Sequence, residues 1–362
     1  MIEISHINKS FPGRQVLHDV SLSVSPCEAM CVIGAMGCGK STLIRCIAGL
    51  EKIDSGNILL DGVPCKPLGK GGEIPKVGMV FQSYNLFPHL TVLHNLMLAP
   101  MQVLHMSAEE AKTEAIRQLE LVGLAEKKNA FPHELSSGQC QRVAMARCLV
   151  MKPRILLLDE ITSALDPLAT SEVKEVLRKL KQEIALIVVT HDMELAMDIA
   201  DKVVFMCDGR IVEVGSPHDI FNNPTQETTR KYVNRIRDYH YAVHSKHYDL
   251  YELHAGIAHF CDRYNLSHEH KFRVQLLSEE VLQVIPLNKG TVDLVLRYSE
   301  KEKTLSLELL MPEGINSVLN NKDFLPDELS MAIIEGLCDQ MFETIKDCPE
   351  GQRMNLCFSL KG

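Results

Sequence analysis

The chain has 362 residues, which exceeds the size at which one hydrophobic core usually stops growing, so two domains are expected. Its composition, 46% hydrophobic and 23% charged, excludes a disordered, collagen-like or low-complexity chain. The formal net charge of -9 provides no general attraction to nucleic acid or to anionic lipid.

Short apolar runs alternate with helical patterns over the first 225 residues, which predicts an α/β fold with a largely parallel sheet covered by helices. Strands are expected at 31–34, 77–81, 155–159 and 184–190, and helices at 40–50, 91–104, 108–122, 138–150 and 168–183. A hairpin is expected at 202–215, where Asp208 and Gly209 would be the two central residues of a tight primed turn. We assign residues 1–225 to the first domain.

The character of the sequence changes after Asn223-Pro224. A linker helix is expected at 226–247, followed by a smaller α+β domain at 248–362. Within that domain the sequence predicts a hairpin at 292–298 and 303–311, a helix at 328–341 and a final strand at 355–360.

Four histidines fall at helical offsets of 0, 4, 7 and 14, and so would share one face of a continuous helix: His240, His244, His247 and His254. Two interpretations are open. One is a metal-binding or pH-responsive patch, and the other is a polar seam between the linker helix and the domain. The seam is favoured because no carboxylate or cysteine completes a set of metal ligands.

Neither a membrane span nor a secretory leader is predicted, because the longest strongly apolar runs are far shorter than the roughly 20 residues that cross a bilayer. The 12 cysteines are spread from Cys27 to Cys357 without a CxxC pair. Such spacing favours reduced thiols over a disulfide framework or a structural zinc site.

Residues 34–42 read GAMGCGKST, which fits the phosphate-loop pattern G-x-x-x-x-G-K-[ST] between a predicted strand and a predicted helix. Glycines let backbone N–H groups surround the phosphates, Lys40 places a cation beside the β- and γ-phosphates of ATP, and the Ser41 hydroxyl can bind Mg²⁺. The predicted nucleotide-binding residues of this loop are Gly34, Ala35, Met36, Gly37, Cys38, Gly39, Lys40, Ser41 and Thr42.

The run ILLLDE at 155–160 places Asp159 at the carboxyl end of a buried strand, where nucleotide chemistry gathers in open α/β sheets. We expect Asp159 to hold Mg²⁺, directly or through water. Glu160 would then stand beside the γ-phosphate and orient or deprotonate the attacking water.

A second helix start, at Leu135 to Gln139, offers the Ser136 hydroxyl and free N–H groups to an anion. One ATP does not need two such sites in one chain, whereas two chains that meet head to tail would use both. With this combination of motifs the sequence resembles the ATP-binding cassette (ABC) ATPases over about residues 1–237.

The resemblance implies roles for residues that the motifs alone leave open. Phe11 matches the aromatic residue that stacks on adenine, Gln82 the glutamine that senses Mg²⁺ and the membrane partner, and His191 the histidine that holds the γ-phosphate. The signature that contacts the ATP of the opposite subunit comprises Ser136, Ser137, Gly138 and Gln139, and the loop at 163–166, which ends at Asp166, crosses the dimer seam. The implied catalytic residues are Glu160, His191 and Gln82, and the implied Mg²⁺-binding residues are Ser41, Gln82 and Asp159.

Three positions depart from the family pattern. Ser137 stands where the signature usually has glycine, Ile161 follows the catalytic glutamate where proline is common, and Met36 lies in the phosphate loop where serine is frequent. None of the three removes a catalytic group, so ATP hydrolysis is expected to persist.

Longer stretches, at 76–100, 106–111, 131–149 and 188–217, resemble the polar amino-acid uptake ATPases of bacteria. That branch implies a homodimer, peripheral at the cytoplasmic face of the cell membrane, which drives integral membrane permease subunits. An extracytoplasmic solute-binding protein feeds those subunits, and nucleic acid takes no part. Two alternatives stay open: a soluble cassette ATPase that acts on nucleic acid or ribosomes, and a regulatory ATPase whose second domain gives the output.

Residues 248–362 vaguely resemble the ATPase module of histidine kinases and anti-sigma factors, and Glu279 and Glu280 stand at the acidic positions of that module. The asparagine and the glycine-rich lid that the module requires are absent from the sequence. We therefore assign no second nucleotide site and expect a regulatory or dimer-stabilising role for this domain.

Overall fold

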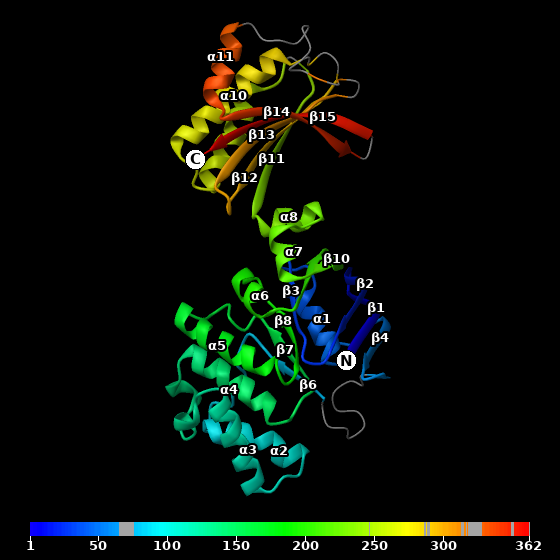
Figure 1. The fold of residues 1–362 in the computed structure, drawn as a ribbon, viewed down its shortest axis with the longest axis vertical. Coiled ribbons are helices and arrows are strands. Elements are labelled where there is room, and N and C mark those ends of the chain that lie inside the picture. The colour runs from blue at the N-terminus through cyan, green and yellow to red at the C-terminus, as the bar shows by residue number, and fades with distance from the viewer. Residues whose placement is uncertain are drawn as a thin grey trace. The chain divides into compact units, whose positions relative to one another are not determined.

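The chain forms two compact units, Met1–Val233 and Asn234–Gly362, which are called the first and the second unit below. The computed structural model describes residues 1–64, 76–245, 247–285, 287, 290–312, 315, 317, 328–348 and 351–361 (Figure 1). Within these residues no helix has the length and apolar character that crossing a bilayer requires.

An antiparallel sheet opens the first unit, with its strands in the order β2-β1-β4-β5. Its strands are β1 (Ile2–Phe11), β2 (Arg14–Val24), β4 (Ser55–Leu60) and β5 (Val63–Pro64). Ile2, Ile4 and Ile7 of β1 point into a core shared with the helix that follows the phosphate loop. The sequence analysis did not predict this sheet.

The central sheet has six strands in the order β10-β9-β3-β8-β7-β6. They are β3 (Ala29–Ile33), β6 (Val77–Val80), β7 (Ile155–Asp159), β8 (Ala185–Val189), β9 (Lys202–Cys207) and β10 (Arg210–Gly215). Every neighbouring pair from β9 to β6 is parallel, and β3, β7 and β8 are buried throughout, as the continuous apolar runs predicted. The predicted α/β fold with a parallel sheet is confirmed.

The predicted hairpin at the end of the first unit is also confirmed. β9 and β10 pair antiparallel, and the two residues between them, Asp208 and Gly209, have φ angles of 46° and 74°. Positive φ at both central positions is the mark of a primed turn, and Asp-Gly is a pair that tolerates it.

Helices cover the central sheet, and α2, α3 and α4 form a helical layer at one end of the unit (Figure 1). The helices of the first unit are α1 (Lys40–Ile47), α2 (Val92–Val103), α3 (Ala108–Leu121), α4 (Ser137–Leu149), α5 (Pro167–Leu180), α6 (Met193–Ile199), α7 (Pro217–Asn222) and α8 (Glu227–Val233). Side chains that accept a backbone N–H hydrogen bond begin most of them, for example Thr91 at α2, Ser107 at α3 and Asp192 at α6.

The contact between α4 and α5 depends on Gly138, where a Cβ atom would lie 2.5 Å from the Cβ of Ala169. We expect Gly138→Ala to destabilise the first unit by roughly 1–3 kcal/mol, because the two helices would have to move apart in a packed core. Gly336→Ala in the second unit is the matched control, since a Cβ there meets nothing within 4 Å. Thermal unfolding followed by circular dichroism makes the comparison, and an unchanged unfolding temperature for Gly138→Ala would contradict the prediction.

The second unit is a five-stranded antiparallel sheet in the order β11-β12-β13-β15-β14. Its elements are β11 (Ile236–Val243), α9 (Leu250–Arg263), α10 (His268–Val284), β12 (Val292–Ser299), β13 (Thr304–Leu310), α11 (Glu328–Leu337), β14 (Gln340–Cys348) and β15 (Gly351–Lys361). Alternate strand residues such as Leu296, Leu307 and Phe358 form a core with Ile257 of α9 and Leu277 of α10. The predicted hairpin is confirmed as β12 and β13, whereas the helix expected at 328–341 ends at Leu337.

The linker helix predicted at 226–247 is wrong, because α8 covers its first part and strand β11 its last part. Arg235 has a left-handed φ of 50°, which interrupts the helix, and alternate residues of the following strand, Tyr239 and Tyr241, pack against the core of the second unit. The division between the units therefore follows Val233 and not residue 225.

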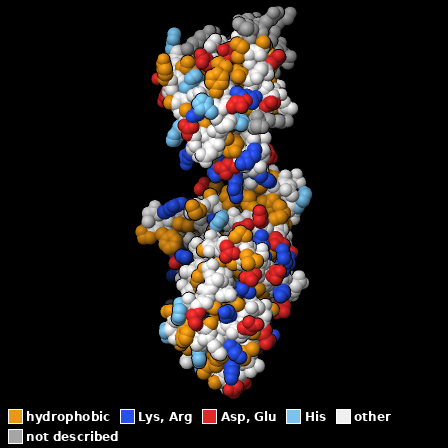
Figure 2. Space-filling model, turned by 90° about the vertical axis from the view of Figure 1, so that its left-hand side faces the viewer, with side chains coloured by type: hydrophobic (Ala, Val, Ile, Leu, Met, Phe, Trp, Pro, Cys, Tyr) orange, Lys and Arg blue, Asp and Glu red, His pale blue; other side chains and the backbone are white. Residues whose placement is uncertain are grey.

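The shared helical face of four histidines is wrong for the same reason. His240 lies on β11 and His254 on α9, so helical offsets do not relate them. Among the described residues, no three His, Cys, Asp or Glu side chains gather as metal ligands. Figure 2 shows histidines scattered over the visible face of the second unit.

Candidate functional site

The phosphate loop joins β3 to α1, and two of its glycines occupy positions that no larger residue fits. At Gly34, with φ of 150°, a Cβ would lie 2.1 Å from the carbonyl oxygen of Met206. At Gly39, with φ of 102°, a Cβ would lie 2.9 Å from the carbonyl oxygen of Val16. The loop also bonds to the β9–β10 turn, because the Gly209 N–H donates to the Cys38 carbonyl over 3.1 Å. The glycine pattern thus seats the loop closely between two neighbouring segments.

Lys40 folds back over this loop. Its side chain is buried, with 6% of the residue exposed, and Nζ donates to the carbonyl oxygens of Gly34 and Ala35 over 2.8 and 2.9 Å. Met36, in the same loop, is 94% exposed. Burial raises the pKa of the Cys38 thiol, so this side chain stays a neutral packing group.

Ser41 and Asp159 meet at the carboxyl end of β7, where the Ser41 hydroxyl donates to Oδ1 of Asp159 over 2.8 Å. Asp159 is 5% exposed, and this burial raises the pKa of its carboxyl group, against the opposing effect of the Ser41 hydrogen bond. A hydroxyl and a carboxylate side by side are oxygen ligands of the kind that Mg²⁺ prefers. The donor set therefore fits the predicted metal.

Glu160 continues the chain from Asp159 in a left-handed conformation, with φ of 54°. Its N–H donates to the Val189 carbonyl over 2.9 Å, and its Oε2 lies 2.5 Å from Nδ1 of His191. A non-glycine residue with positive φ is strained, and such strain gathers at functional positions. The structure thus brings the predicted base and the predicted γ-phosphate residue into direct contact.

Gln82 reaches the same cluster through Ser163. Its Nε2 donates to the Ser163 hydroxyl over 3.1 Å, and that hydroxyl donates to the Glu160 carbonyl over 2.8 Å. The sequence analysis placed Ser163 in the loop of the dimer seam and gave it no part beside Glu160. Its position three residues after the glutamate was the available signal.

The signature residues begin α4. Ser136 accepts a hydrogen bond from the Gln139 N–H, and the Gln139 side chain accepts one from the Ser136 N–H, so the two form a capping box. Asp166 caps α5 through a 2.9 Å bond from the Ala169 N–H. Figure 1 shows α4 and α1 in different parts of the unit. Ser136 itself is exposed.

Phe11 ends β1, with 40% of its surface exposed, and the Lys9 ammonium lies 4.7 Å from the centre of its ring. The ring is therefore partly open to solvent, as the predicted stacking on adenine requires. Ile161, which follows Glu160 where the family pattern commonly has proline, is buried in the main core of the first unit. It therefore packs where proline is common and leaves the polar cluster unchanged.

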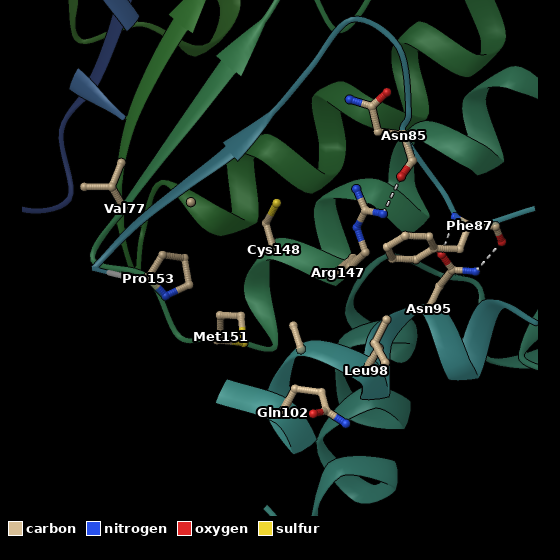
Figure 3. Close-up of a pocket in the computed structure, with 12 residues that line it drawn as sticks. Val77, Asn85, Phe87, Asn95, Leu98, Gln102, Arg147, Cys148, Met151 and Pro153 are labelled. Atoms are coloured by element: carbon tan, nitrogen blue, oxygen red, sulfur yellow. Dashed lines mark hydrogen bonds between the residues drawn. The ribbon is translucent and has the colours of Figure 1, made fainter. Parts of the chain in front are cut away.

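A groove of about 630 Å³ lies beside the loop that follows Gln82, between the start of β6, α2 and the end of α4 (Figure 3). Its lining is largely apolar and includes Phe87, Leu98, Met151 and Pro153. Figure 3 shows the Arg147 side chain beside the Phe87 ring, with Leu98 from α2 below them.

Arg147 is the cation of this groove. Its guanidinium donates to the carbonyl oxygens of Asn85 and Tyr84 over 2.6 and 3.3 Å, and burial lowers the pKa of Arg147. Within the described part of the chain, no acidic side chain forms an ion pair with it. The sequence analysis did not single out Arg147, whose contacts lie about sixty residues away along the chain.

Comparison with known proteins identifies relatives of this chain. The family model described as ABC transporter matches residues 17–163. The chain is 46% identical to the glutamine transport ATP-binding protein GlnQ of Geobacillus stearothermophilus, over 65% of this chain and 99% of that protein. It is 39% identical to the arginine transport ATP-binding protein ArgV of Corynebacterium glutamicum, over 65% of this chain and 98% of that protein.

Solved structures agree with the sequence relatives. CbiO1 of Clostridium perfringens, part of the ABC transporter complex cbiONQ, matches with a TM-score of 0.57 and 30% identity, over 61% of this chain and 90% of that one. The ATP-binding cassette MJ0796, in a dimeric post-hydrolysis state with ADP and phosphate, matches with a TM-score of 0.55 and 30% identity, over 60% of this chain and 99% of that one.

Proposed function

The chain belongs to the ABC transporter family of ATP-binding proteins, and on this premise we propose that it is the ATP-hydrolysing subunit of an importer of polar amino acids. The observation that carries the proposal is the likeness, over nearly their whole length, to proteins named for glutamine and arginine transport. The chain is an ATPase of this family; the solute class, the partners and the residue roles below are proposals.

Hydrolysis requires a water molecule placed in line with the γ-phosphate of ATP and relieved of a proton as it attacks. Glu160 is the proposed base, held at the edge of the sheet by the N–H bond to Val189. His191, in contact with Glu160, is the proposed donor to the γ-phosphate. Gln82 joins the same cluster through Ser163, so a displacement of the loop at Gln82 reaches the backbone of the base.

Lys40 is the proposed contact of the β- and γ-phosphates, and Phe11 the proposed contact of adenine. Ser41, Asp159 and Gln82 would hold Mg²⁺, which supplies neutralisation of the phosphate charge when bound. The hydroxyl and carboxylate of Ser41 and Asp159 already lie 2.8 Å apart, so the pair needs little rearrangement to share one ion.

The placement of the signature supports a head-to-tail homodimer. Ser136 is exposed, and it would form an anion site with the N–H groups at the start of α4, which lies in a different part of the unit from α1 (Figure 1). In a head-to-tail pair that site would cover the ATP bound at Lys40 of the other subunit, and the loop ending at Asp166 would line the seam.

The groove beside Gln82 is the proposed seat of a cytoplasmic helix of the permease subunits. It is apolar, it adjoins the loop that carries Gln82, and it contains a half-buried cation without an acidic partner among the described residues. A helix that presents apolar side chains and one carboxylate would match both properties. The chain would then lie peripherally at the cytoplasmic face of the membrane.

We expect Arg147→Glu to reduce copurification with the permease at least tenfold, because two carboxylates would face each other in an apolar groove. The measurement uses the full chain coexpressed with the permease subunits that it is proposed to drive. Arg147→Lys, which keeps the charge, should retain much of the binding. Arg117→Glu is the matched control, since Arg117 is an exposed cation of α3 outside the groove lining.

Recovery of binding when an acidic residue of the permease helix is replaced by arginine would support the pairing. Undiminished copurification of Arg147→Glu would contradict the groove assignment alone. If the natural chain fails to bind the permease at all, the importer proposal falls and the regulatory alternative gains.

A further inference from the structure

The last helix of the first unit, α8, contacts the phosphate loop. Tyr232 of α8 donates its hydroxyl to the carbonyl oxygen of Gly34 over 3.1 Å. Its ring packs on Phe205 of β9, with 5.1 Å between the ring centres. Phe205 is itself buried and pairs with Ile33, the residue before Gly34. The hydroxyl is therefore held against the loop by a packed aromatic pair.

Within the described residues, the Gly34 carbonyl has two hydrogen-bond donors. One is Tyr232 and the other is Lys40, whose Nζ lies 2.8 Å away. Gly34 is buried, so this carbonyl depends on protein donors. In the proposed function Lys40 turns to the phosphates of ATP, and the carbonyl then keeps Tyr232 alone.

We propose that Tyr232 is a positioning residue for ATP binding, because its hydroxyl keeps the Gly34 carbonyl hydrogen-bonded after Lys40 has turned to the nucleotide. A buried carbonyl left without a partner costs more than an ordinary hydrogen bond is worth, since its desolvation is uncompensated. The inference rests on the proposed role of Lys40, and neither the motifs nor the family resemblance gave Tyr232 a part.

This role differs from simple support of the fold. Without nucleotide, Lys40 still satisfies the carbonyl when the tyrosine hydroxyl is missing, so the free chain loses little. With nucleotide bound, loss of the Tyr232 hydroxyl leaves the Gly34 carbonyl without a hydrogen-bond donor among the described residues. Loss of the hydroxyl therefore destabilises the nucleotide-bound state. The packing of the ring against Phe205 is kept with and without nucleotide.

Tyr232→Phe in the full chain removes the hydroxyl and keeps the ring. We expect its affinity for the non-hydrolysable ATP analogue adenylyl imidodiphosphate with Mg²⁺ to fall about tenfold, which corresponds to about 1.4 kcal/mol. The unfolding temperature without nucleotide should change by less than about 2 °C. In turnover, KM for ATP should rise while kcat stays within about twofold, because the water-positioning cluster is untouched.

Tyr241→Phe is the matched control, since the Tyr241 hydroxyl donates to the Asp249 carbonyl over 3.2 Å in the second unit. A second test uses the free chain, where Lys40→Ala and Tyr232→Phe together should lower the unfolding temperature by more than the sum of the single changes. Only in the double variant does the Gly34 carbonyl lose both donors.

The outcomes separate the inference from its premise. If Lys40→Ala leaves the affinity for the analogue unchanged, the proposed role of Lys40 and the inference both fall. If Lys40→Ala abolishes binding but Tyr232→Phe binds as the natural chain does, the inference alone is overturned. An equal loss of stability in Tyr232→Phe with and without nucleotide would also overturn it, because the hydroxyl would then support only the fold.

Discussion

Glutamine in place of Glu160 is expected to leave ATP binding intact while turnover falls by roughly 10²- to 10⁴-fold, the contribution typical of a positioned general base. Glutamine has the same size, and its amide oxygen can still accept a hydrogen bond at the position where Glu160 meets His191. The left-handed backbone and the N–H bond to Val189 do not involve the side chain. The variant therefore loses the proton acceptor and little else.

Equilibrium binding of ATP and steady-state release of phosphate measure the two halves of this prediction. Glu175→Gln, at an exposed position of α5, is the matched control for the loss of one negative charge. Hydrolysis by Glu160→Gln at the natural rate would remove Glu160 from the role of base. A parallel loss of ATP affinity would show that the carboxylate shapes the ground state as well.

If each ATP site is built from two subunits, mixing two different inactive variants should restore ATP hydrolysis. Lys40→Ala removes the phosphate contact of a chain's own site, and Ser136→Arg blocks the signature with which a chain covers the site of its partner. In a head-to-tail heterodimer both changes fall on the same site, so the second site keeps a natural Lys40 and a natural Ser136. Equal mixing puts half of the chains in heterodimers with one of two sites intact, so about one quarter of the natural turnover should return.

Turnover and trapped nucleotide are both measured over a range of mixing ratios. Each variant alone is the control, and Ser136→Ala is the matched variant that removes the hydroxyl without adding bulk. No recovery of turnover or of trapped nucleotide at any ratio would contradict the head-to-tail arrangement.

Motifs with a fixed spacing predicted the local geometry of the candidate site. The phosphate loop stands between a strand and a helix, and Ser41 meets Asp159 across the sheet. Glu160 and His191 follow adjacent parallel strands, β7 and β8, whose carboxyl ends meet at one edge, so their contact follows from the strand order. The catalytic and binding roles of these residues stay predictions.

Other features had no local signal. The N-terminal sheet escaped prediction because β1 pairs with β2 through several register shifts, which break the regular alternation that marks a half-buried strand. The helix expected at 226–247 failed because tertiary packing of the second unit turned alternating tyrosines into a strand. Tyr232 and Arg147 are ordinary residues in sequence, and only the fold brings them to Gly34 and Asn85.

The position of β3 in the central sheet has a consequence for the ribosome-bound chain. β3 lies between β8 and β9, and the loop after it bonds to the turn at Gly209. Residues that are synthesised early therefore cannot complete their contacts until residues that are synthesised late become available. At about 5–20 residues per second, the ribosome needs roughly 10 to 30 s to pass from Lys40 to Gly209. Until then the nascent phosphate loop lacks its contacts with Met206 and Gly209, and the complete site that ATP would stabilise has not formed. Nucleotide can therefore assist only the last steps of this unit's folding, once its final strands have left the ribosome.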